Sequence, residues 1–319
     1  MKTAFIRLLT PVALAVLLLT SAVADTVEAL DGSGTLLETL PMDDYTAYGP
    51  KIDPEDMSDD GYSDASIRVE MWHEWIDDAR YNVAHIWIAH PSQLRTALYN
   101  DTMKKNNYIS AIAEQKNAVV AIGGEYLSYN IGSYSIRMGQ TLRKKGYRER
   151  DALFIDQNGD FHITRGFKKD SLTELEEQGL QTVNLFNFGP ALIIDSDPVY
   201  DDLRTRQYAV GDPQNDEPRT AIGQIGPLEY LLVVVDGRSV RITEEDGTVR
   251  ASRGDSLYDV GKYMLAHGCT QAYALDGGGS AAMYYGKTGY YSKPSSKRAV
   301  TDIIYFAALP TASQAASEE

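Results

Sequence analysis

Residues 275–280 read Leu-Asp-Gly-Gly-Gly-Ser, so a carboxylate, three glycines and a hydroxyl follow the end of a short apolar run. Three consecutive glycines cost backbone entropy and pack nothing, which indicates a loop where a ligand approaches the backbone. Successive amides in such a loop form a concavity that favours anions. Asp276, at the expected strand end, is positioned for acid–base work. The alternative is a sharp bend between two strands, with Asp276 as a turn residue.

Three further segments have the same form, an apolar run that ends in polar residues or glycine. The first delivers Glu125 after Gly123-Gly124, and the second, residues 186–192, delivers a Gly-Pro bend. The third carries Arg219 and Thr220 after Pro218 and leads into Asp236 before Gly237-Arg238. If these ends converge, three carboxylates meet two arginines. Guanidinium forks match phosphate oxygens, and carboxylates among them suit nucleophilic or general-base work at a sugar carbon. The alternatives are a hairpin turn at Asp236-Gly237 and solvated surface arginines.

The N-terminus has the pattern of a secretory signal. Lys2 and Arg7 precede an apolar run over residues 8–19, and Ala22-Val23-Ala24 gives a small-x-small cleavage site. This pattern predicts cleavage after Ala24 and a secreted or cell-surface protein. The alternative is an uncleaved membrane anchor, although the run is short for a spanning helix.

Composition limits the partners. The formal charge is 30 − 45 = −15, which argues against nucleic acid and anionic membrane as partners and requires a local positive patch for any anionic substrate. The one cysteine, Cys269, excludes an intramolecular disulfide and is expected to be a core filler. The chain lacks His-Glu-x-x-His, paired cysteines, a Walker loop and Gly-x-Ser-x-Gly. We therefore predict no metal site and no cofactor, with a divalent metal requirement left open.

The remaining pattern predicts one sheet-rich α+β domain with a few flanking helices. Residues 25–66 are expected to be an acidic linker or loosely docked arm, 67–309 the domain and 310–319 a disordered tail. Strands are expected at 85–89, 118–122, 191–194, 231–235 and 303–306, and helices at 172–178 and 256–267. Ser256-x-x-Asp259 starts the second helix and Gly268 ends it. Residues 238–250 contain Asp246-Gly247 and are predicted to form a projecting hairpin.

The order of these segments, over about residues 81–309, resembles the phosphodiester glycosidase family. The matching pieces are Phe-Gly-Pro-Ala-Leu at 188–192, Pro-Arg-Thr-Ala-Ile-Gly at 218–223, Val-Asp-Gly-Arg at 235–238, Ser-Arg-Gly at 252–254, Leu-Asp-Gly-Gly-Gly-Ser at 275–280 and Lys-Arg-Ala-Val at 297–300. Bacterial relatives usually read Ala-Ile-Asn-Gly-Asp/Gly-Tyr/Phe-Phe near the start. This chain has Gly123 at the Asn position, Glu125 at the Asp/Gly position and Leu127 at the last Phe position.

The resemblance implies an exported bacterial hydrolase that cleaves sugar-1-phosphodiesters in a wall polymer or exopolysaccharide. Asp276 is the expected nucleophile or base, with Asp236 and Glu125 as second choices. The residues expected to bind substrate are Arg219, Thr220, Arg238, Gly277, Gly278, Gly279, Ser280 and Arg298. The alternative is a non-catalytic surface protein that binds glycan or assembles exopolysaccharide on the same scaffold, which the loss of the Asn at Gly123 favours.

Overall fold

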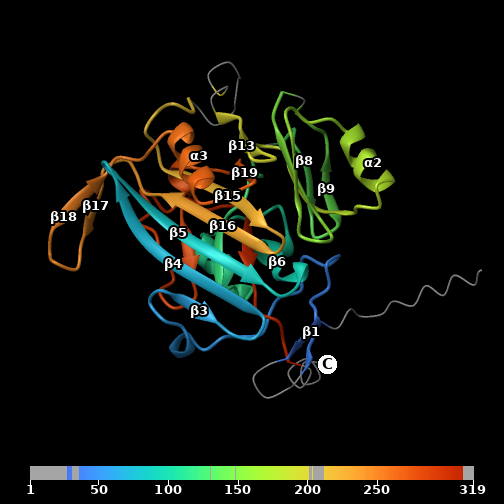
Figure 1. Cartoon of the computed structure of the whole chain (residues 1–319), viewed down its shortest axis with the longest axis horizontal. Coiled ribbons are helices and arrows are strands. Elements are labelled where there is room, and N and C mark those ends of the chain that lie inside the picture. Colours follow the sequence, from blue (N-terminus) through green and yellow to red (C-terminus); the bar gives the residue numbers. More distant parts are fainter. Residues whose placement is uncertain are drawn as a thin grey trace, which may run out of the picture.

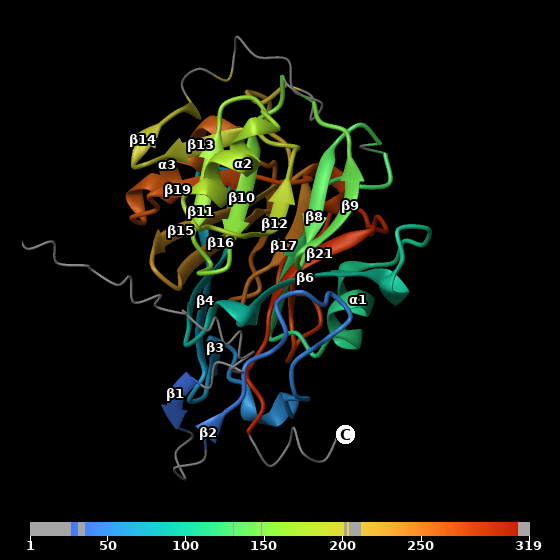
Figure 2. The ribbon, with the colours of Figure 1, turned by 90° about the vertical axis from the view of Figure 1, so that its right-hand side faces the viewer.

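The computed structural model of the protein describes residues 27–30, 36–129, 131–147, 149–200, 203 and 212–311. Strands dominate these residues, and three α-helices lie around them (Figures 1 and 2). The expected sheet-rich α+β class is confirmed. The predicted signal sequence, and the tail beyond residue 311, lie outside the described residues.

The largest sheet has eight strands in the order β14-β13-β19-β15-β16-β5-β4-β3. Their bounds are β3 Gly61–Ser63, β4 Ile67–Ile76, β5 Ala79–Ile88, β13 Ala191–Ile194, β14 Asp197–Pro198, β15 Arg219–Gly226, β16 Glu229–Val235 and β19 Gln271–Ala274. All neighbouring pairs in it are antiparallel. Central β16 is buried on both faces, which explains its uninterrupted apolar run.

A four-stranded sheet packs behind the first one, in the order β20-β7-β21-β6. Its strands are β6 Leu94–Leu98, β7 Val120–Gly123, β20 Met283–Tyr285 and β21 Asp302–Phe306. The main core lies between the two sheets and contains side chains of both, among them Ile86, Leu232, Ile122 and Ile304. Helix α1 (Ile109–Gln115), which the sequence analysis missed, covers the outer face through Ile112 and Ala113.

A five-stranded sheet at one end of the molecule has the order β11-β10-β12-β8-β9. It comprises β8 Tyr134–Arg137, β9 Gln140–Lys144, β10 Ala152–Asp156, β11 Phe161–Thr164 and β12 Thr182–Phe186. Helix α2 (Asp170–Glu177) packs on it through Leu175, which joins a cluster with Phe154 and Leu185. Figure 1 shows this unit beside the end of the large sheet.

Helix α3 (Leu257–Ala266) covers the other face of the eight-stranded sheet near β13 and β15. As predicted, Ser256 caps its start, with the Ser256 Oγ accepting from the Asp259 amide at 3.1 Å. The predicted hairpin also forms, from β17 (Val240–Thr243) and β18 (Val249–Ser252), and projects from the body in Figure 1. Cys269 is buried beside this helix, and burial raises the pKa of its thiol to about 12.

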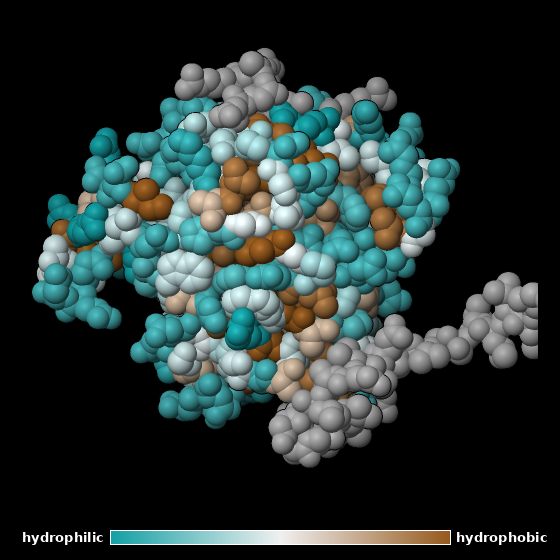
Figure 3. All heavy atoms as spheres, viewed as in Figure 1, coloured by the Kyte–Doolittle hydropathy of each residue, from teal (hydrophilic) through white to brown (hydrophobic). Residues whose placement is uncertain are grey.

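Residues 36–66, expected to be a linker or loose arm, contact the domain at several places. Leu37, Leu40 and Met57 are buried, and β3 extends the large sheet. The first two of these residues form β2 (Leu36–Leu37), which pairs with β1 (Val27–Leu30). The face shown in Figure 3 is mostly polar, with separate apolar patches. Within the described residues, no helix has both the length and the apolar character that crossing a bilayer requires.

Candidate active site

A cavity of about 360 Å³ opens where β19 ends and β15 begins, beside the first residue of α3. Its charged lining consists of three acids and three arginines: Asp212, Glu217, Asp276, Arg219, Arg238 and Arg298. Tyr126, Phe188 and Leu257 add apolar walls. The cavity therefore supplies the local positive groups that an anionic ligand needs on a protein of net charge −15.

Asp276 lies in this cavity, held by Arg298. The Arg298 Nη2 donates to both carboxylate oxygens, at 3.1 and 3.0 Å, and to the Gly277 carbonyl at 3.1 Å. The Arg298 Nε donates to the Ser280 Oγ at 2.7 Å, and the Arg298 guanidinium lies over the Tyr126 ring. Burial raises the pKa of Asp276, while Ser280 and Arg298 act in the opposite direction. A desolvated carboxylate with a raised pKa is a stronger base than one in water.

The glycine run is explained by close approaches within this loop. A Cβ on Gly277 would lie 2.6 Å from the Pro218 carbonyl oxygen, and one on Gly278 would lie 3.0 Å from the Arg238 Nη2. The Gly278 amide donates to the Pro218 carbonyl at 2.8 Å. The expectation that this amide binds an anion is therefore wrong. Gly279 lies outside the cavity lining, close to Ser296 and Arg298. The glycines chiefly allow two arginines to approach the loop.

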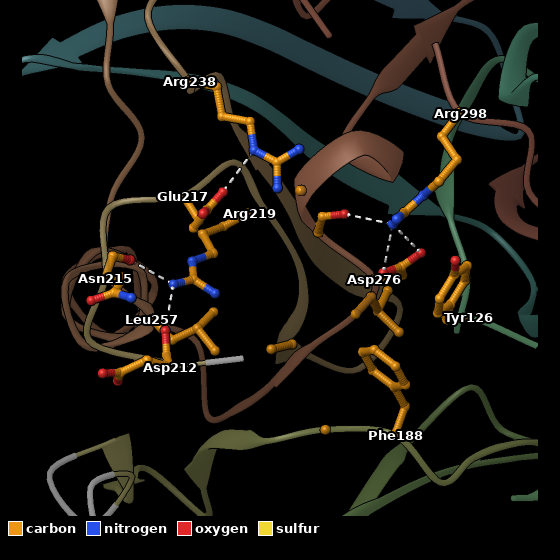
Figure 4. Close-up of a pocket in the computed structure, with 15 residues that line it drawn as sticks. Tyr126, Phe188, Asp212, Asn215, Glu217, Arg219, Arg238, Leu257, Asp276 and Arg298 are labelled. Atoms are coloured by element: carbon orange, nitrogen blue, oxygen red, sulfur yellow. Dashed lines mark hydrogen bonds and ion pairs between the residues drawn. The ribbon is translucent and has the colours of Figure 1, made fainter. Parts of the chain in front are cut away.

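Arg238 forms the opposite wall of the cavity (Figure 4). Its Nε donates to the Glu217 Oε2 at 2.9 Å, and half of its side chain is exposed. Within the described chain, its two terminal amino groups have no hydrogen-bond partner. They are therefore the cationic donors best placed to receive a phosphate.

Arg219 also lines the cavity, but its donors hold the protein together. Its Nε donates to the Asp255 carbonyl at 3.0 Å, and its Nη2 donates to the carbonyls of Asp212 and Asn215 at 3.2 and 2.6 Å. Burial lowers its pKa to about 10, so it stays charged at neutral pH. Arg219 therefore shapes the loop at residues 212–217, which forms one wall.

The expected convergence of the three carboxylates is wrong for Asp236, whose side chain does not line the cavity. Val233 and Val235 pack under α3, whereas Val234 packs in the main core on the other face. Since side chains alternate along a strand, Asp236 points away from the α3 face. There its Oδ1 accepts from the Lys293 amide at 2.8 Å, and its Oδ2 lies 3.5 Å from the Arg80 Nη1. Burial raises its pKa to about 6.

Glu125 is likewise buried outside the cavity lining. Its carboxylate accepts from the hydroxyls of Ser133 and Ser135 and from the Asn187 amide, and it lies 3.5 Å from the Arg137 Nη2. Arg137 also pairs with Asp302 at 2.8 Å. This network lies behind Tyr126 and Phe188, so it supports the cavity wall and does not line the cavity.

Two predicted ligand-binding hydroxyls also lie outside the cavity lining. Thr220 is next to Arg219, but its side chain lies on the opposite face of β15. There its buried Oγ1 has no hydrogen-bond partner among the described residues. Ser280 is buried and accepts from Arg298, so it orients that arginine.

Sequence reasoning missed several cavity residues, of which Glu217 has the largest chemical consequence. With Asp212, it joins Asp276 among the acids that line the cavity, and its only sequence cue is its place directly before Pro218-Arg219. Phe188 and Tyr126 stood within matched segments but were not selected. No group of three or more His, Cys, Asp or Glu side chains in the described ranges is arranged to hold a metal ion.

Comparison with known proteins adds to this geometry. One relative is the SPbeta prophage-derived uncharacterized protein YomE of Bacillus subtilis (strain 168). It is 30% identical over 192 residues, which are 58% of this chain and 27% of YomE. The chain therefore spans about a quarter of that relative's length.

Two solved structures are similar to this chain, and the first of them shares its fold. One is the zebrafish N-acetylglucosamine-1-phosphodiester alpha-N-acetylglucosaminidase catalytic domain, auto-inhibited by its pro-peptide, with a TM-score of 0.58 and 17% identity. That match covers 76% of this chain and 82% of the other. The second is a putative exported protein from Burkholderia pseudomallei K96243, with a TM-score of 0.49 and 15% identity over 72% of this chain and 74% of the other.

Residues 116–307 match the sequence model of a protein family, which is described as "Phosphodiester glycosidase". This range contains every residue that lines the cavity. Because the match extends over more than half of the 319 residues, this chain belongs to the phosphodiester glycosidase family.

Proposed function

We propose that this protein is an exported hydrolase that cleaves the bond between a sugar's anomeric carbon and a phosphodiester, in a bacterial wall polymer or exopolysaccharide. The observation that carries the proposal is a carboxylate, Asp276, in a cavity whose opposite wall presents the free amino groups of Arg238. Family membership supports the reaction class. The N-terminal pattern that ends at Ala24 supports export.

In the proposed reaction, Arg238 binds the phosphate and Asp276 acts at the anomeric carbon. Asp276 either attacks that carbon or takes a proton from the water that attacks it. The bond from the carbon to the phosphate oxygen breaks, and the phosphomonoester leaves with the electron pair. Net addition of water gives a free sugar and a phosphomonoester. The phosphate leaves as a stable anion, so little general-acid help is needed.

The two paired carboxylates have different tasks in this scheme. Arg298 fixes the orientation of Asp276, which is desolvated and therefore basic. Glu217 holds the Nε of Arg238 and leaves the two amino groups of that arginine pointing at the substrate phosphate. Tyr126 and Phe188 provide apolar surface against which a sugar ring packs.

Isotope labelling tests the bond that is cleaved. The purified protein is incubated in water enriched in ¹⁸O with a panel of small substrates. In each of them a sugar-1-phosphate is esterified to nitrophenol (the small nitrophenyl substrate) or to UMP, as in UDP-sugars. The products are analysed by mass spectrometry. We expect the label in the sugar hydroxyl and none in the phosphate, and we expect Asp276→Asn to abolish release. Label in the phosphate would identify a phosphodiesterase and overturn the proposal.

A glycan-binding protein without turnover is the second candidate. It is favoured by one observation, that only one of the three carboxylates expected to be catalytic lines the cavity. This candidate predicts that the wild-type protein releases no sugar from any member of the panel. It also predicts that the protein binds glycan and that Asp276→Asn leaves this binding unchanged.

A further inference from the structure

The end of the molecule formed by the five-stranded sheet and α2 has a second cavity, of about 580 Å³, which the proposed reaction does not use. It lies between the end of β9 and the segment that leads into α2, two elements that face the viewer in Figure 2. Four cationic side chains line it, Lys144, Arg165, Lys168 and Lys169, against one acid, Asp170.

This concentration of positive charge contrasts with the chain as a whole, which has 45 acidic and 30 basic residues. Lys144, Lys168 and Lys169 are exposed, and none of them forms an ion pair with any residue in the described part of the chain. Their charge is therefore uncompensated and attracts anions. Further basic residues adjoin Lys144 in the sequence, at 143, 145, 148 and 150.

Aromatic residues line the same cavity. Tyr134 and Phe167 are both buried, with ring centroids 5.3 Å apart. An aromatic surface beside exposed ammonium groups suits a ligand with both apolar C–H faces and negative charge. A sugar that bears phosphate has both properties.

A buried side chain, Asp151, lies between a wall of the second cavity and a wall of the first. The Arg165 Nε lies 3.6 Å from the Asp151 Oδ2, and Asp151 also accepts from the Gly166 amide at 2.9 Å. On its other side, the Asp151 Cβ lies 3.4 Å from where a Cβ on Gly189 would be, and Gly189 lines the first cavity. One side chain, Asp151, therefore contacts both cavity walls.

We infer that the second cavity is a binding site for an anionic glycan chain, which it holds while the first cavity cleaves a bond elsewhere on the same chain. This inference rests on the proposed function and specifies its substrate class as a polymer with repeated negative charges. Binding at a distant unit raises the local concentration of cleavable bonds at Asp276. A small sugar phosphodiester fills only the first cavity and gains nothing from the second.

The test uses residues 25–319, the chain that remains after the expected cleavage. It compares two double variants that change the net charge by the same amount. Lys144→Glu/Lys168→Glu reverses charge at the second cavity. Lys51→Glu/Arg241→Glu is the matched control, because both residues are exposed and lie away from both the first and the second cavity. Binding of poly(glycerol phosphate), a polymer with repeated phosphodiesters, is measured by titration calorimetry at about 50 and about 300 mM NaCl. Turnover is measured on the small nitrophenyl substrate.

We expect Lys144→Glu/Lys168→Glu to weaken polymer binding at low salt by at least about tenfold and to flatten its salt dependence. The control variant should bind within about twofold of wild type, and both should turn over the small substrate at the wild-type rate. Equal weakening in both double variants, or unchanged binding in the first, would overturn the inference. So would equal competition by duplex DNA, because that result indicates non-specific polyanion binding. Absence of wild-type turnover on the small substrate would instead contradict the proposed function.

Discussion

Asp276 and Asp236 occupy the same kind of position, each following a buried strand and preceding a glycine, yet their side chains have different surroundings. Asp276 lies two residues beyond the end of β19, on the face that α3 covers, where it lines the cavity beside Arg298. Asp236 ends β16 on the opposite face, where Arg80 and the Lys293 amide hold it. The comparison teaches that side-chain alternation, and not the motif, decides which carboxylate lines the cavity.

The strongest test of this comparison uses the two isosteric changes Asp276→Asn and Asp236→Asn. The first should lower turnover by about 10²–10⁴-fold, since it removes the base while keeping the shape of the side chain and one of the two acceptors for Arg298. The second should leave turnover within a few-fold of wild type. Initial rates on the small nitrophenyl substrate, with melting curves as a folding control, decide the matter. Equal losses in both variants would show that the two residues act together.

The next test sharpens the comparison through pH. The pKa of Asp236 is raised by burial to about 6, above the value of 3.8 that applies when it is unfolded and hydrated. Between these values the folded state holds a proton that the unfolded state releases. The stabilising contribution of this proton is therefore complete below about pH 4 and is lost as the pH rises through 6, a change of about 3 kcal/mol.

Urea unfolding at pH 4, 5, 6 and 7 measures this contribution. Asp302, whose pKa burial also raises to about 6, adds to the wild-type curve, so the difference between wild type and Asp236→Asn isolates one residue. We expect the variant to lose less stability across this range. Asp246→Asn, in the exposed hairpin turn, is the control and should follow the wild-type curve. Parallel curves for wild type and Asp236→Asn would contradict the assigned pKa shift.

The smallest expected effect separates the two arginines that face Asp276 across the cavity. Arg238→Lys keeps the charge but loses the planar fork, so we expect KM for the anionic substrate to rise by about tenfold with little change in melting temperature. Arg219→Lys should mainly lower the melting temperature, because the carbonyls of Asp212, Asn215 and Asp255 lose the donors that hold this loop to β15. The opposite pattern would exchange the two roles.

Much of the framework could be predicted from sequence, because its signals are local. The five apolar runs are all strands, and both expected helices form, with Ser256 capping α3. The five-stranded sheet was missed because polar residues interrupt the apolar pattern of its strands, as Ser135 and Arg137 do in β8, and because β9 is mostly polar. Glu217 escaped notice for a different reason. Its position in the cavity depends on Arg219 pulling the preceding loop against β15, a long-range arrangement that spacing does not encode.

Three motif segments meet at Pro218, and this junction limits how the sequence can change. Pro218 is enclosed between two other motif segments, since a Cβ on Gly237 would lie 2.8 Å from its nitrogen and one on Gly277 would lie 2.6 Å from its oxygen. No segment can therefore gain bulk unless another withdraws. Descendants of this scaffold should inherit the three segments as one unit, and an attempt to graft a single segment onto a different host should fail. Sequence changes should therefore accumulate in the loops that do not contact this junction.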